Sequence, residues 1–451
     1  MLRRLASFFT FILKHLLPDA YLFAILLTFL TGILALIFTN SDFMKVITTW
    51  GNGIYGILAF TMQMILVLLM GYVLALSPPV QKILVWIANK AENPGKAIMI
   101  VTFIGAVSFW VNWGFGLVIG VLLAMEIAKR NRKVHFPLLV AAGYVGITIW
   151  HQGLSGSIPL LIATAKHPQN LIEKATGMVV PVSNTLFAAF NLLPVIILVI
   201  TLPFLFKLMH PKEDEVIALS DQKAKEIASE TLSVPVPPNP TLAQRIDHSY
   251  TINFIFAAMG LVYLIWHFST KGLDLNLNIV IFIFFILGVI LHGKPINYIN
   301  AVNVGIKSCG GIALQFPLYG GIMGIMVGTG LAAVVANGFV AISNAQTFYM
   351  MQFWGAGLIN MFVPSGGGQW VVQGPITIEA AKIMGIDPVK SAMMVAWGDQ
   401  WTNLIQPFWA LPVLGIAGLS AKDIMGYTAI GLIWAGVVLS AFALLAGFGV
   451  L

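Results

Sequence analysis

Two polar stretches, 150–157 and 398–406, interrupt otherwise apolar parts of this chain. A carboxylate in an apolar span is costly and marks a functional site by default, so we expect Asp399 to bind a sodium ion or take up a proton. His151 is a second candidate for ion coupling, because imidazole titrates near neutral pH. Structural roles, a helix cap for Asp399 and a hydrogen-bonded core position for His151, are the alternatives. The same stretches hold amide and hydroxyl groups that could bind a substrate: Gln152, Ser155, Ser157, Asn403 and Gln406.

Two glycine-containing segments, 112–116 and 362–370, also interrupt apolar sequence. Pro364 and the glycines that follow it cannot continue a helix easily, because proline lacks an N–H and glycine is conformationally free. Unpaired backbone groups are tolerated at membrane depth only against protein or a water-filled cavity. We therefore expect both segments to line a binding site, with a plain turn as the alternative. The candidate substrate ligands here are Asn112, Gly114, Gly116, Ser365, Gly366, Gly367, Gly368, Gln369 and Gln373.

The chemistry of these four segments favours a small anion. Helix N-termini offer unpaired N–H groups and partial positive charge, which suits a carboxylate. None of the segments contains Lys or Arg, whereas a phosphate site would normally include one. The sequence also lacks a phosphate-binding loop and the His-Glu-x-x-His and Gly-x-Ser-x-Gly motifs. We therefore expect no enzyme and no cofactor beyond a coupling ion; an intramembrane hydrolase using Ser365 and His151 is the disfavoured alternative.

The composition defines the environment of these segments. Of 451 residues, 59% are hydrophobic and 9% charged, and the mean hydropathy is +0.91. Apolar runs of about twenty residues indicate membrane-spanning helices, so the chain is expected to be an all-α polytopic membrane protein with about nine full spans. An interfacial helix is expected near 5–17. The unbroken spans are expected near 21–39, 52–76, 186–209, 249–268, 277–292, 302–327 and 425–449, and broken spans at 136–165 and 389–419.

Positive charges orient this arrangement. Arg3, Arg4 and Lys14 place the N-terminus in the cytoplasm, and the C-terminus is expected in the periplasm. The apolar block 97–128 begins and ends among lysines and arginines and is too short for two full spans. It is therefore expected to be a re-entrant hairpin, and 347–384 to be a second one that enters from the opposite face.

Weak internal similarity predicts two inverted-topology repeats, each with one hairpin and one broken helix. Glu126–Lys129 corresponds to Glu379–Lys382, and Pro159 corresponds to Pro412. Both Glu–Lys pairs are expected to be interfacial ion pairs. The charged, proline-rich segment 210–248 is expected to be a cytoplasmic linker between the first repeat, 1–209, and the second, 249–451. Inverted repeats with broken helices near the midplane are typical of secondary transporters.

Four motifs identify a resemblance to a known family. They are VNWGFG at 111–116, VPSGGG at 363–368, QGP at 373–375 and QPFWALP at 406–412. In this combination the chain resembles the bacterial short-chain fatty acid transporter family nearly end to end. The resemblance implies uptake of acetoacetate, butyrate and similar small monocarboxylates across the inner membrane. It also implies a place in the ion transporter superfamily, an elevator-like transport domain and a dimer.

Together these expectations describe an ion-coupled symporter of short-chain fatty acids. We expect both tips and both breaks to bind one carboxylate near the midplane, with tryptophans along its short tail and Asp399 near the coupled proton or sodium ion. The unit containing 97–165 and 347–419 is expected to move against the remaining spans. A small-anion channel and a carrier of another small carboxylate are the alternatives.

Overall fold

A computed structural model of the protein describes residues 8, 11, 20–166, 170–220, 235–272, 277–364 and 366–451. Across these residues all regular secondary structure is helical. Most of the expected interfacial helix at 5–17, as well as Ser365, lies outside the described part. The helices pack as two groups, named here the flanking group and the site group.

The flanking group surrounds α17, which packs along both α2 and α3, while α15 packs along α4 and α14. Its long helices are rich in aliphatic and aromatic residues, and many of these side chains face outward. The group consists of α2 (Ala20–Phe38), α3 (Phe43–Gly56), α4 (Leu58–Ala75), α5 (Pro78–Ala88), α14 (Tyr250–Lys271), α15 (Leu277–His292), α16 (Pro295–Gly305), η4 (Ile306–Cys309), α17 (Gly310–Gly328) and α18 (Leu331–Ala341).

The site group holds the four segments that the sequence singles out. Its first half comprises α6 (Pro94–Val111), α7 (Trp113–Arg130), α8 (Phe136–Tyr144), η1 (Val145–Gln152), α9 (Ser157–Ala163), α10 (Leu171–Thr176), η2 (Val182–Asn184) and α11 (Ala189–Leu208). Its second half comprises α19 (Phe348–Asn360), α20 (Gly366–Ile383), α21 (Pro388–Thr402), η5 (Asn403–Ile405), α22 (Pro407–Ala417) and α23 (Ala421–Gly447). Two short helices, η3 (Glu213–Glu215) and α13 (Leu242–Asp247), lie in the segment between the halves.

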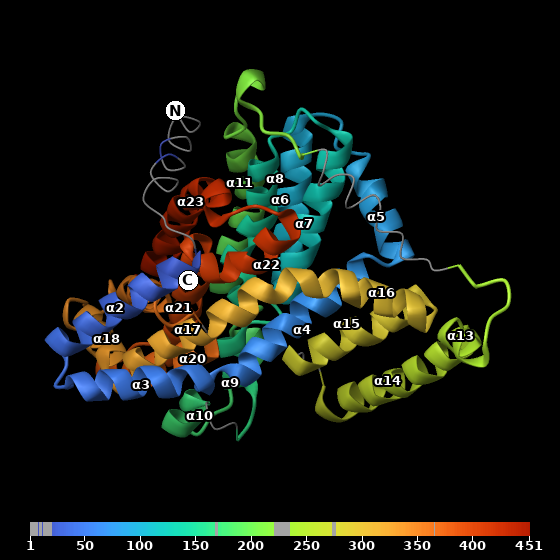
Figure 1. Ribbon diagram of the computed structural model, residues 1–451. Coiled ribbons are helices and arrows are strands. Elements are labelled where there is room, and N and C mark those ends of the chain that lie inside the picture. The colour runs from blue at the N-terminus through green and yellow to red at the C-terminus, as the bar shows by residue number, and fades with distance from the viewer. Residues whose placement is uncertain are drawn as a thin grey trace.

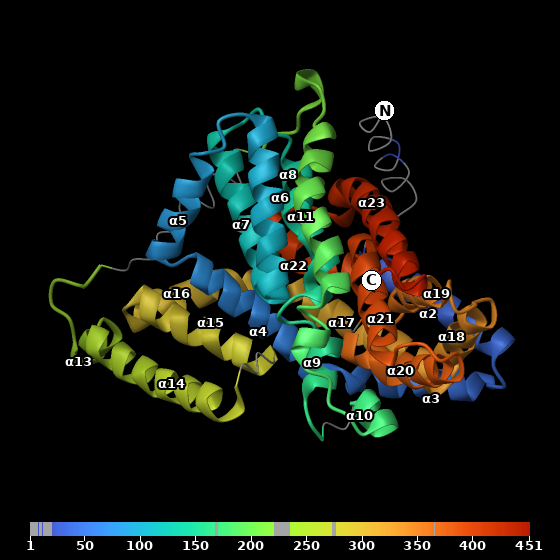
Figure 2. The same cartoon turned by 180° about the vertical axis from the view of Figure 1, so that it is seen from behind.

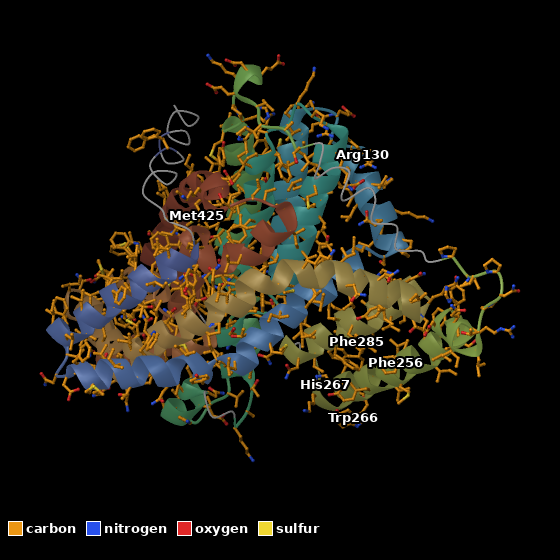
Figure 3. All side chains as sticks on the ribbon, viewed as in Figure 1. Arg130, Phe256, Trp266, His267, Phe285 and Met425 are labelled. Atoms are coloured by element: carbon orange, nitrogen blue, oxygen red, sulfur yellow. The ribbon has the colours of Figure 1, made fainter. Side chains whose placement is uncertain are left out.

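Several helices of the two groups run in different directions. Figures 1 and 2 show α6, α7, α8 and α11 side by side, whereas α3, α14 and α15 run across the lower part of the molecule. In Figure 3, Phe256, Trp266 and Phe285 lie in the lobe of α14 and α15, far from Met425 on α23. The groups meet where α4 and α5 pack on α7, α17 on α22, and α18 on α19 and α20.

Helices end where the sequence predicts interruptions. The first hairpin is formed by α6 and α7, which pack together and are joined at Asn112. The second is formed by α19 and α20, and the broken segments divide into α8, η1 and α9 and into α21, η5 and α22. Re-entry of the hairpins from opposite membrane faces and the inverted repeat stay predictions.

Other parts of the chain differ from the predicted spans. The span expected at 52–76 begins within α3 and continues as α4, and the one expected at 302–327 is divided among α16, η4 and α17. The helices α5 and α18 are not predicted from the sequence, because each has 11 residues, too few for a membrane span. In the described residues, seven helical segments are long and apolar enough to cross a membrane.

The first part of the linker is bound to the site group. Ile217 exchanges two hydrogen bonds with the start of α8: its N–H donates to His135 Nδ1 at 3.0 Å, and its carbonyl accepts from Phe136 N–H at 2.8 Å. His135 Nε2 lies 3.0 Å from Tyr427 Oη on α23. Residues 221–234 lie outside the described part of the linker.

Candidate functional site

The two helix breaks lie against each other and are joined by side-chain amides. Gln400 Oε1 accepts hydrogen bonds from the backbone N–H groups of His151 and Gln152, at 2.8 and 3.2 Å. Its Nε2 donates to Gln152 Oε1 at 2.6 Å. Both side chains are fully buried, so the bonds satisfy groups that would otherwise be costly to bury. The structure thereby brings together residues that are about 250 positions apart in the sequence.

The candidate coupling residues form a direct pair at this junction. His151 Nδ1 lies 3.1 Å from Asp399 Oδ1, and the two side chains are 0% and 1% exposed. His151 Nε2 accepts the backbone N–H of Ile158 in the first turn of α9, at 3.0 Å. Asp399 Oδ2 is buried and has no hydrogen-bond partner among the described residues. One carboxylate oxygen is therefore left for an ion, a proton or a substrate.

The imidazole of His151 is held by stacking and by a close backbone contact. Trp150 stacks on it with ring centroids 4.2 Å apart and an angle of 14° between the planes. Gly366, the first residue of α20, also lies against the ring, since a Cβ added there would be 2.4 Å from His151 Cε1. The second hairpin therefore contacts the His151–Asp399 pair through a residue that has no side chain. Ser365, the preceding candidate, lies outside the described residues.

The tip of the first hairpin is bound to the first break by hydrogen bonds. Asn112 Oδ1 caps α7 by accepting the N–H of Phe115 at 3.1 Å. The next residue, Trp113, donates its backbone N–H to Ser155 Oγ at 3.0 Å. Leu154 N–H donates to the carbonyl of Trp110 at 2.8 Å. Asn112 and Ser155 thus both fix the position of the tip.

The second break contributes a chain of amides. Asn403 Oδ1 accepts the indole N–H of Trp150 at 2.9 Å, and Asn403 Nδ2 donates to Gln406 Oε1 at 3.2 Å. Gln406 Nε2 donates to the carbonyl of Asn360 on the second hairpin. This series of amide hydrogen bonds therefore connects the first break, the second break and the second hairpin.

The remaining candidates bond or pack within their own hairpins, or lie in the first turns of helices. Gln369 Nε2 donates to the Ala356 carbonyl at 2.9 Å and to Gln373 Oε1 at 2.8 Å, so these amides bond within their own hairpin. Gly116 packs against Phe109 inside the first hairpin. Gly114 is in the first turn of α7 and Ser157 is the first residue of α9. Gly367 has open space at its Cβ position, and Gly368 follows it in α20.

Two asparagines that the sequence analysis missed complete the network. Asn191 on α11 donates Nδ2 to the Gln152 carbonyl at 3.0 Å and accepts the indole N–H of Trp397 at 3.0 Å. Asn360 on α19 donates to the Asp399 carbonyl at 2.6 Å. Both asparagines are 0% exposed. A lone polar residue in a long apolar helix was the signal that could have indicated Asn191.

Tryptophans form one wall beside the breaks. Trp113 packs edge-on against Trp150 and Trp409, with centroid distances of 6.4 and 5.4 Å. Trp409 also lies 6.2 Å from Trp150, and its indole N–H is buried without a partner among the described residues. The wall offers apolar surface and one unused donor close to the His151–Asp399 pair.

The hydrogen-bonded centre of the site contains no Lys or Arg side chain among the described residues. In the part of the chain that the structure describes, no group of three or more His, Cys, Asp and Glu residues could hold a metal ion. Glu126, at the far end of α7, does pair with Lys129 at 3.1 Å and with Arg130, as the sequence predicts. The second expected pair is not formed, since Glu379 and Lys382 have no ion-pair partner among the described residues.

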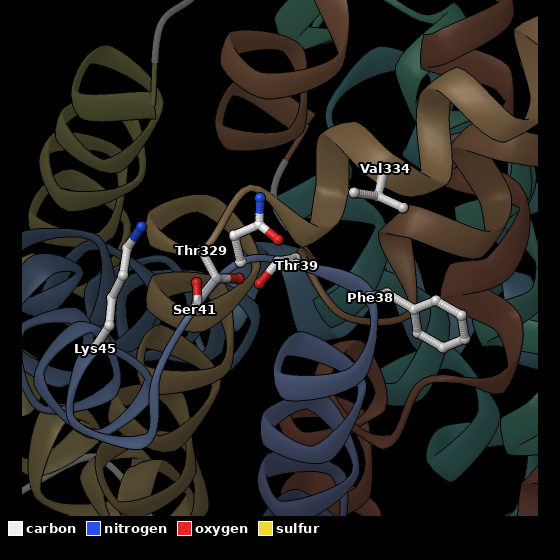
Figure 4. Close-up of a pocket in the computed structure, with 7 residues that line it drawn as sticks. Phe38, Thr39, Ser41, Lys45, Thr329 and Val334 are labelled. Carbon is white, nitrogen blue, oxygen red and sulfur yellow. The ribbon is translucent and has the colours of Figure 1, made fainter.

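A surface pocket lies elsewhere in the molecule. Figure 4 shows it between the turn that joins α2 to α3 and the junction of α17 and α18, and its volume is about 360 Å³. Its lining residues are Phe38, Thr39, Asn40, Ser41, Lys45, Thr329 and Val334. None of the candidate site residues lines this pocket, so the buried network remains the candidate site.

Comparisons with known proteins point to one family. The chain matches the short-chain fatty acid transporter family over residues 1–445. A relative from Escherichia coli (strain K12), named for that family, is 41% identical over 438 residues, which are 97% of this chain and 98% of the relative. A relative from Haemophilus influenzae (strain ATCC 51907 / DSM 11121 / KW20 / Rd), also named for it, is 40% identical over 96% of this chain and 97% of its own length.

Among solved structures, the YdaH transporter of Alcanivorax borkumensis aligns with 96% of this chain and 99% of its own, at 16% identity and a TM-score of 0.46. That score is too low to support an argument about this fold. The family match and the apolar helices establish a multi-pass membrane protein. The chain belongs to the short-chain fatty acid transporter family, whose members are transporters and not enzymes.

Proposed function

We propose that this protein is an ion-coupled symporter of short-chain monocarboxylates, such as acetoacetate and butyrate, in the bacterial inner membrane. The observation that carries the proposal is the buried Asp399, whose Oδ2 has no partner among the described residues. An ionisable group inside a membrane bundle, paired on one side and free on the other, suits an ion or proton pathway. The family supplies the substrate class.

We assign the substrate carboxylate to the junction of the breaks and the hairpin tips. The proposed position is beside Asp399 and Gly366, with the wall of Trp113, Trp150 and Trp409 along the aliphatic tail. A hydrogen-bonded site without Lys or Arg would bind one weakly charged anion and release it again. The absence of a fixed cation also makes binding depend on a coupled proton or sodium ion.

Alternating access is proposed to be elevator-like, with the site group moving against the flanking group. The contacts support a larger moving body than the sequence suggests. Asn191 on α11 is bonded to both breaks, and α23 holds the second break through Thr428, which donates to the Leu404 carbonyl at 2.6 Å. We therefore include α11 and α23 in the moving body. The proposal retains inverted repeats, a dimer, a cytoplasmic N-terminus and a periplasmic C-terminus.

Labelled butyrate in proteoliposomes tests the transport function. A symporter gives counterflow and saturable uptake above that of protein-free vesicles, with a rate that depends on an imposed proton or sodium gradient. A channel, the competing function, gives no counterflow. Wild-type vesicles that show neither gradient-dependent uptake nor counterflow of any short-chain carboxylate would contradict the proposal.

Cross-linking tests the elevator motion, because Cys309 is the single native cysteine and its removal gives a clean background. Cysteines at Phe115 and Phe284, whose rings are 6.0 Å apart, would join α7 to α15 across the two groups and stop transport when linked. Matched pairs within one group, Gln63 with Asn278 and Trp354 with Ser440, should leave transport unchanged. Full transport after cross-linking of positions 115 and 284 would contradict the elevator mechanism.

A further inference from the structure

The hydrogen bonds around His151 fix where its proton lies. Because Nε2 accepts the N–H of Ile158, this nitrogen carries no proton of its own. The single proton of the neutral ring is therefore on Nδ1, from which it is donated to Asp399 Oδ1. A second proton cannot enter the ring without breaking the bond from Ile158. Asp399 Oδ2 is thus the position of the pair that remains open to a proton.

Most neighbouring oxygens are already engaged by N–H donors, and Asn360 Oδ1 is the exception, since it is buried without a partner among the described residues. Gln400 Oε1 accepts two backbone N–H groups, Asn403 Oδ1 and Asn191 Oδ1 each accept an indole N–H, and the Asp399 carbonyl accepts Asn360 Nδ2. A dehydrated metal cation needs several oxygen ligands at once. Sodium binding here would compete with these donors, whereas a proton needs one free oxygen.

We infer that the coupled ion is a proton, which binds Asp399 Oδ2 and is held between this oxygen and the carboxylate of the substrate. The inference rests on the proposed function and identifies its coupling ion. With His151 neutral and Asp399 ionised, a substrate anion would be a second negative charge in a buried site, which is strongly unfavourable. Protonation of Oδ2 removes the first charge and provides an O–H donor for a charge-assisted hydrogen bond.

The resulting transport step is balanced in charge and protons. One proton and one monocarboxylate enter together and leave together, and no bond other than O–H is formed or broken. Transport is therefore electroneutral. His151 is a positioning residue in this scheme, because it orients and stabilises the carboxylate without carrying the transported proton. Gly366 packs on the ring, so the second hairpin contacts the residue that positions the proton-binding carboxylate.

Other charged groups are too distant to replace His151. From the elements packed on α21, His151 is the titratable side chain that contacts Asp399 in the described structure. The other titratable or charged groups on α19–α21 and α23 lie toward helix ends: Tyr349, Glu379, Lys382, Asp387, Lys390, Lys422, Asp423 and Tyr427. The protonation of Asp399 should therefore determine the pH dependence of transport.

The decisive experiment compares wild type, Asp399→Asn and the matched control Asp387→Asn in proteoliposomes. Asp387 lies at the exposed N-cap of the same helix, where asparagine can also cap. Initial butyrate uptake is measured above protein-free vesicles, because butyric acid crosses lipid unaided. We expect an inward proton gradient to accelerate wild type and the control several-fold, with no effect of a sodium gradient or of a membrane potential.

The asparagine at 399 mimics the protonated acid, because its Nδ2 can donate where Oδ2–H would. Counterflow by Asp399→Asn should persist and lose its dependence on pH, while acceleration by the proton gradient disappears. Acceleration of wild type by a sodium gradient at equal pH would overturn the inference even if the variant did not fold. So would a pH dependence of Asp399→Asn equal to that of wild type. Neither result would contradict the proposal that the protein is a transporter. That proposal is contradicted only if the wild type shows no counterflow.

A second variant tests the role of His151. In His151→Gln the carboxylate loses the fixed imidazole donor that stabilises its ionised form. The pH at half-maximal uptake should then shift upward by about one unit. A lower rate with an unchanged pH profile would mean that His151 has only a structural role, and would overturn its assignment as a positioning residue.

Discussion

The two hairpins contact the centre of the molecule in different ways. In the first hairpin a single residue, Asn112, joins the two helices, and Trp113 bonds to Ser155 of the adjacent break. In the second hairpin, α19 ends at Asn360, and the first residue of α20, Gly366, packs on the ring of His151. The first tip contacts the centre by directional hydrogen bonds. The start of α20 contacts it by close packing, whereas Asn360 at the end of α19 is hydrogen-bonded to the second break.

This difference suggests different roles for the two tips: the first is fixed in position, and the second contacts the His151–Asp399 pair. Breaking the bonds of the first tip would leave buried polar groups unpaired, at a cost of about 1–3 kcal/mol each. Moving the start of α20 away from the ring would give up packing contacts, while the bonds of Asn360 at the end of α19 could stay intact. The start of α20 can therefore move at the His151 ring more easily than the first tip, and variants of the two tips should have distinct effects.

The largest effect is expected from Gly366→Ala. The new Cβ would be 2.4 Å from His151 Cε1, so the hairpin or the ring must shift, and transport should fall at least tenfold. Gly367→Ala meets nothing within 4 Å and should cost less. Equal losses at the two positions would instead indicate that substrate touches both glycines. Gly338→Ala, at an open position in α18, controls for a glycine-to-alanine change in a helix, and initial butyrate uptake is the measurement.

Next in size is Ser155→Ala, which tests the first tip. It removes the acceptor of the Trp113 N–H and should reduce stability by about 1–3 kcal/mol, while the pH profile of transport stays unchanged. Thermal unfolding in detergent measures the loss, and Ser155→Thr, which keeps the hydroxyl, should recover most of it. A changed pH profile in Ser155→Ala would contradict the prediction that the first tip contributes to stability and not to the protonation of Asp399.

A smaller effect is expected from Asn112→Ala, which removes the cap of α7. Loss of such a cap costs about 1 kcal/mol. Asn112→Ser should retain most of the stability, because serine is also a good cap and carries no charge, and yet weaken transport if the Asn112 amide donates to the substrate anion. Unfolding temperature and butyrate affinity, measured on the same preparations, separate capping from binding.

The smallest effect distinguishes the far ends of the two hairpins. Glu126, with an 8% exposed side chain, pairs with Lys129 and Arg130, whereas Glu379 is exposed. Glu126→Gln should therefore destabilise by an amount near the upper end of the roughly 0–1 kcal/mol of a surface pair, and Glu379→Gln should be near neutral. Equal unfolding temperatures for the two variants would contradict the difference between the hairpins.

Much of the site could be predicted from residue types. A proline, clustered glycines and a lone carboxylate cannot be accommodated in hydrocarbon without compensation, so they marked the ends of helices and the candidate Asp399. The same logic did not reveal the roles of Gln369 and Gln373, because polarity indicates that an amide needs partners but does not identify them. It also missed Asn191, since one asparagine barely changes the hydropathy of its helix.

By itself, the sequence determined that this is a helical membrane protein, where its helices are interrupted and to which family it belongs. Tertiary structure alone decided that His151 and Asp399, 248 positions apart, form one pair with a single free oxygen, and that Gly366 lies on the ring. The physical reason is that the residue types of a segment determine whether it can lie in lipid or in water, and this is a local property. Hydrogen-bond partners and close contacts depend on distances between segments, which exist only after the helices have packed.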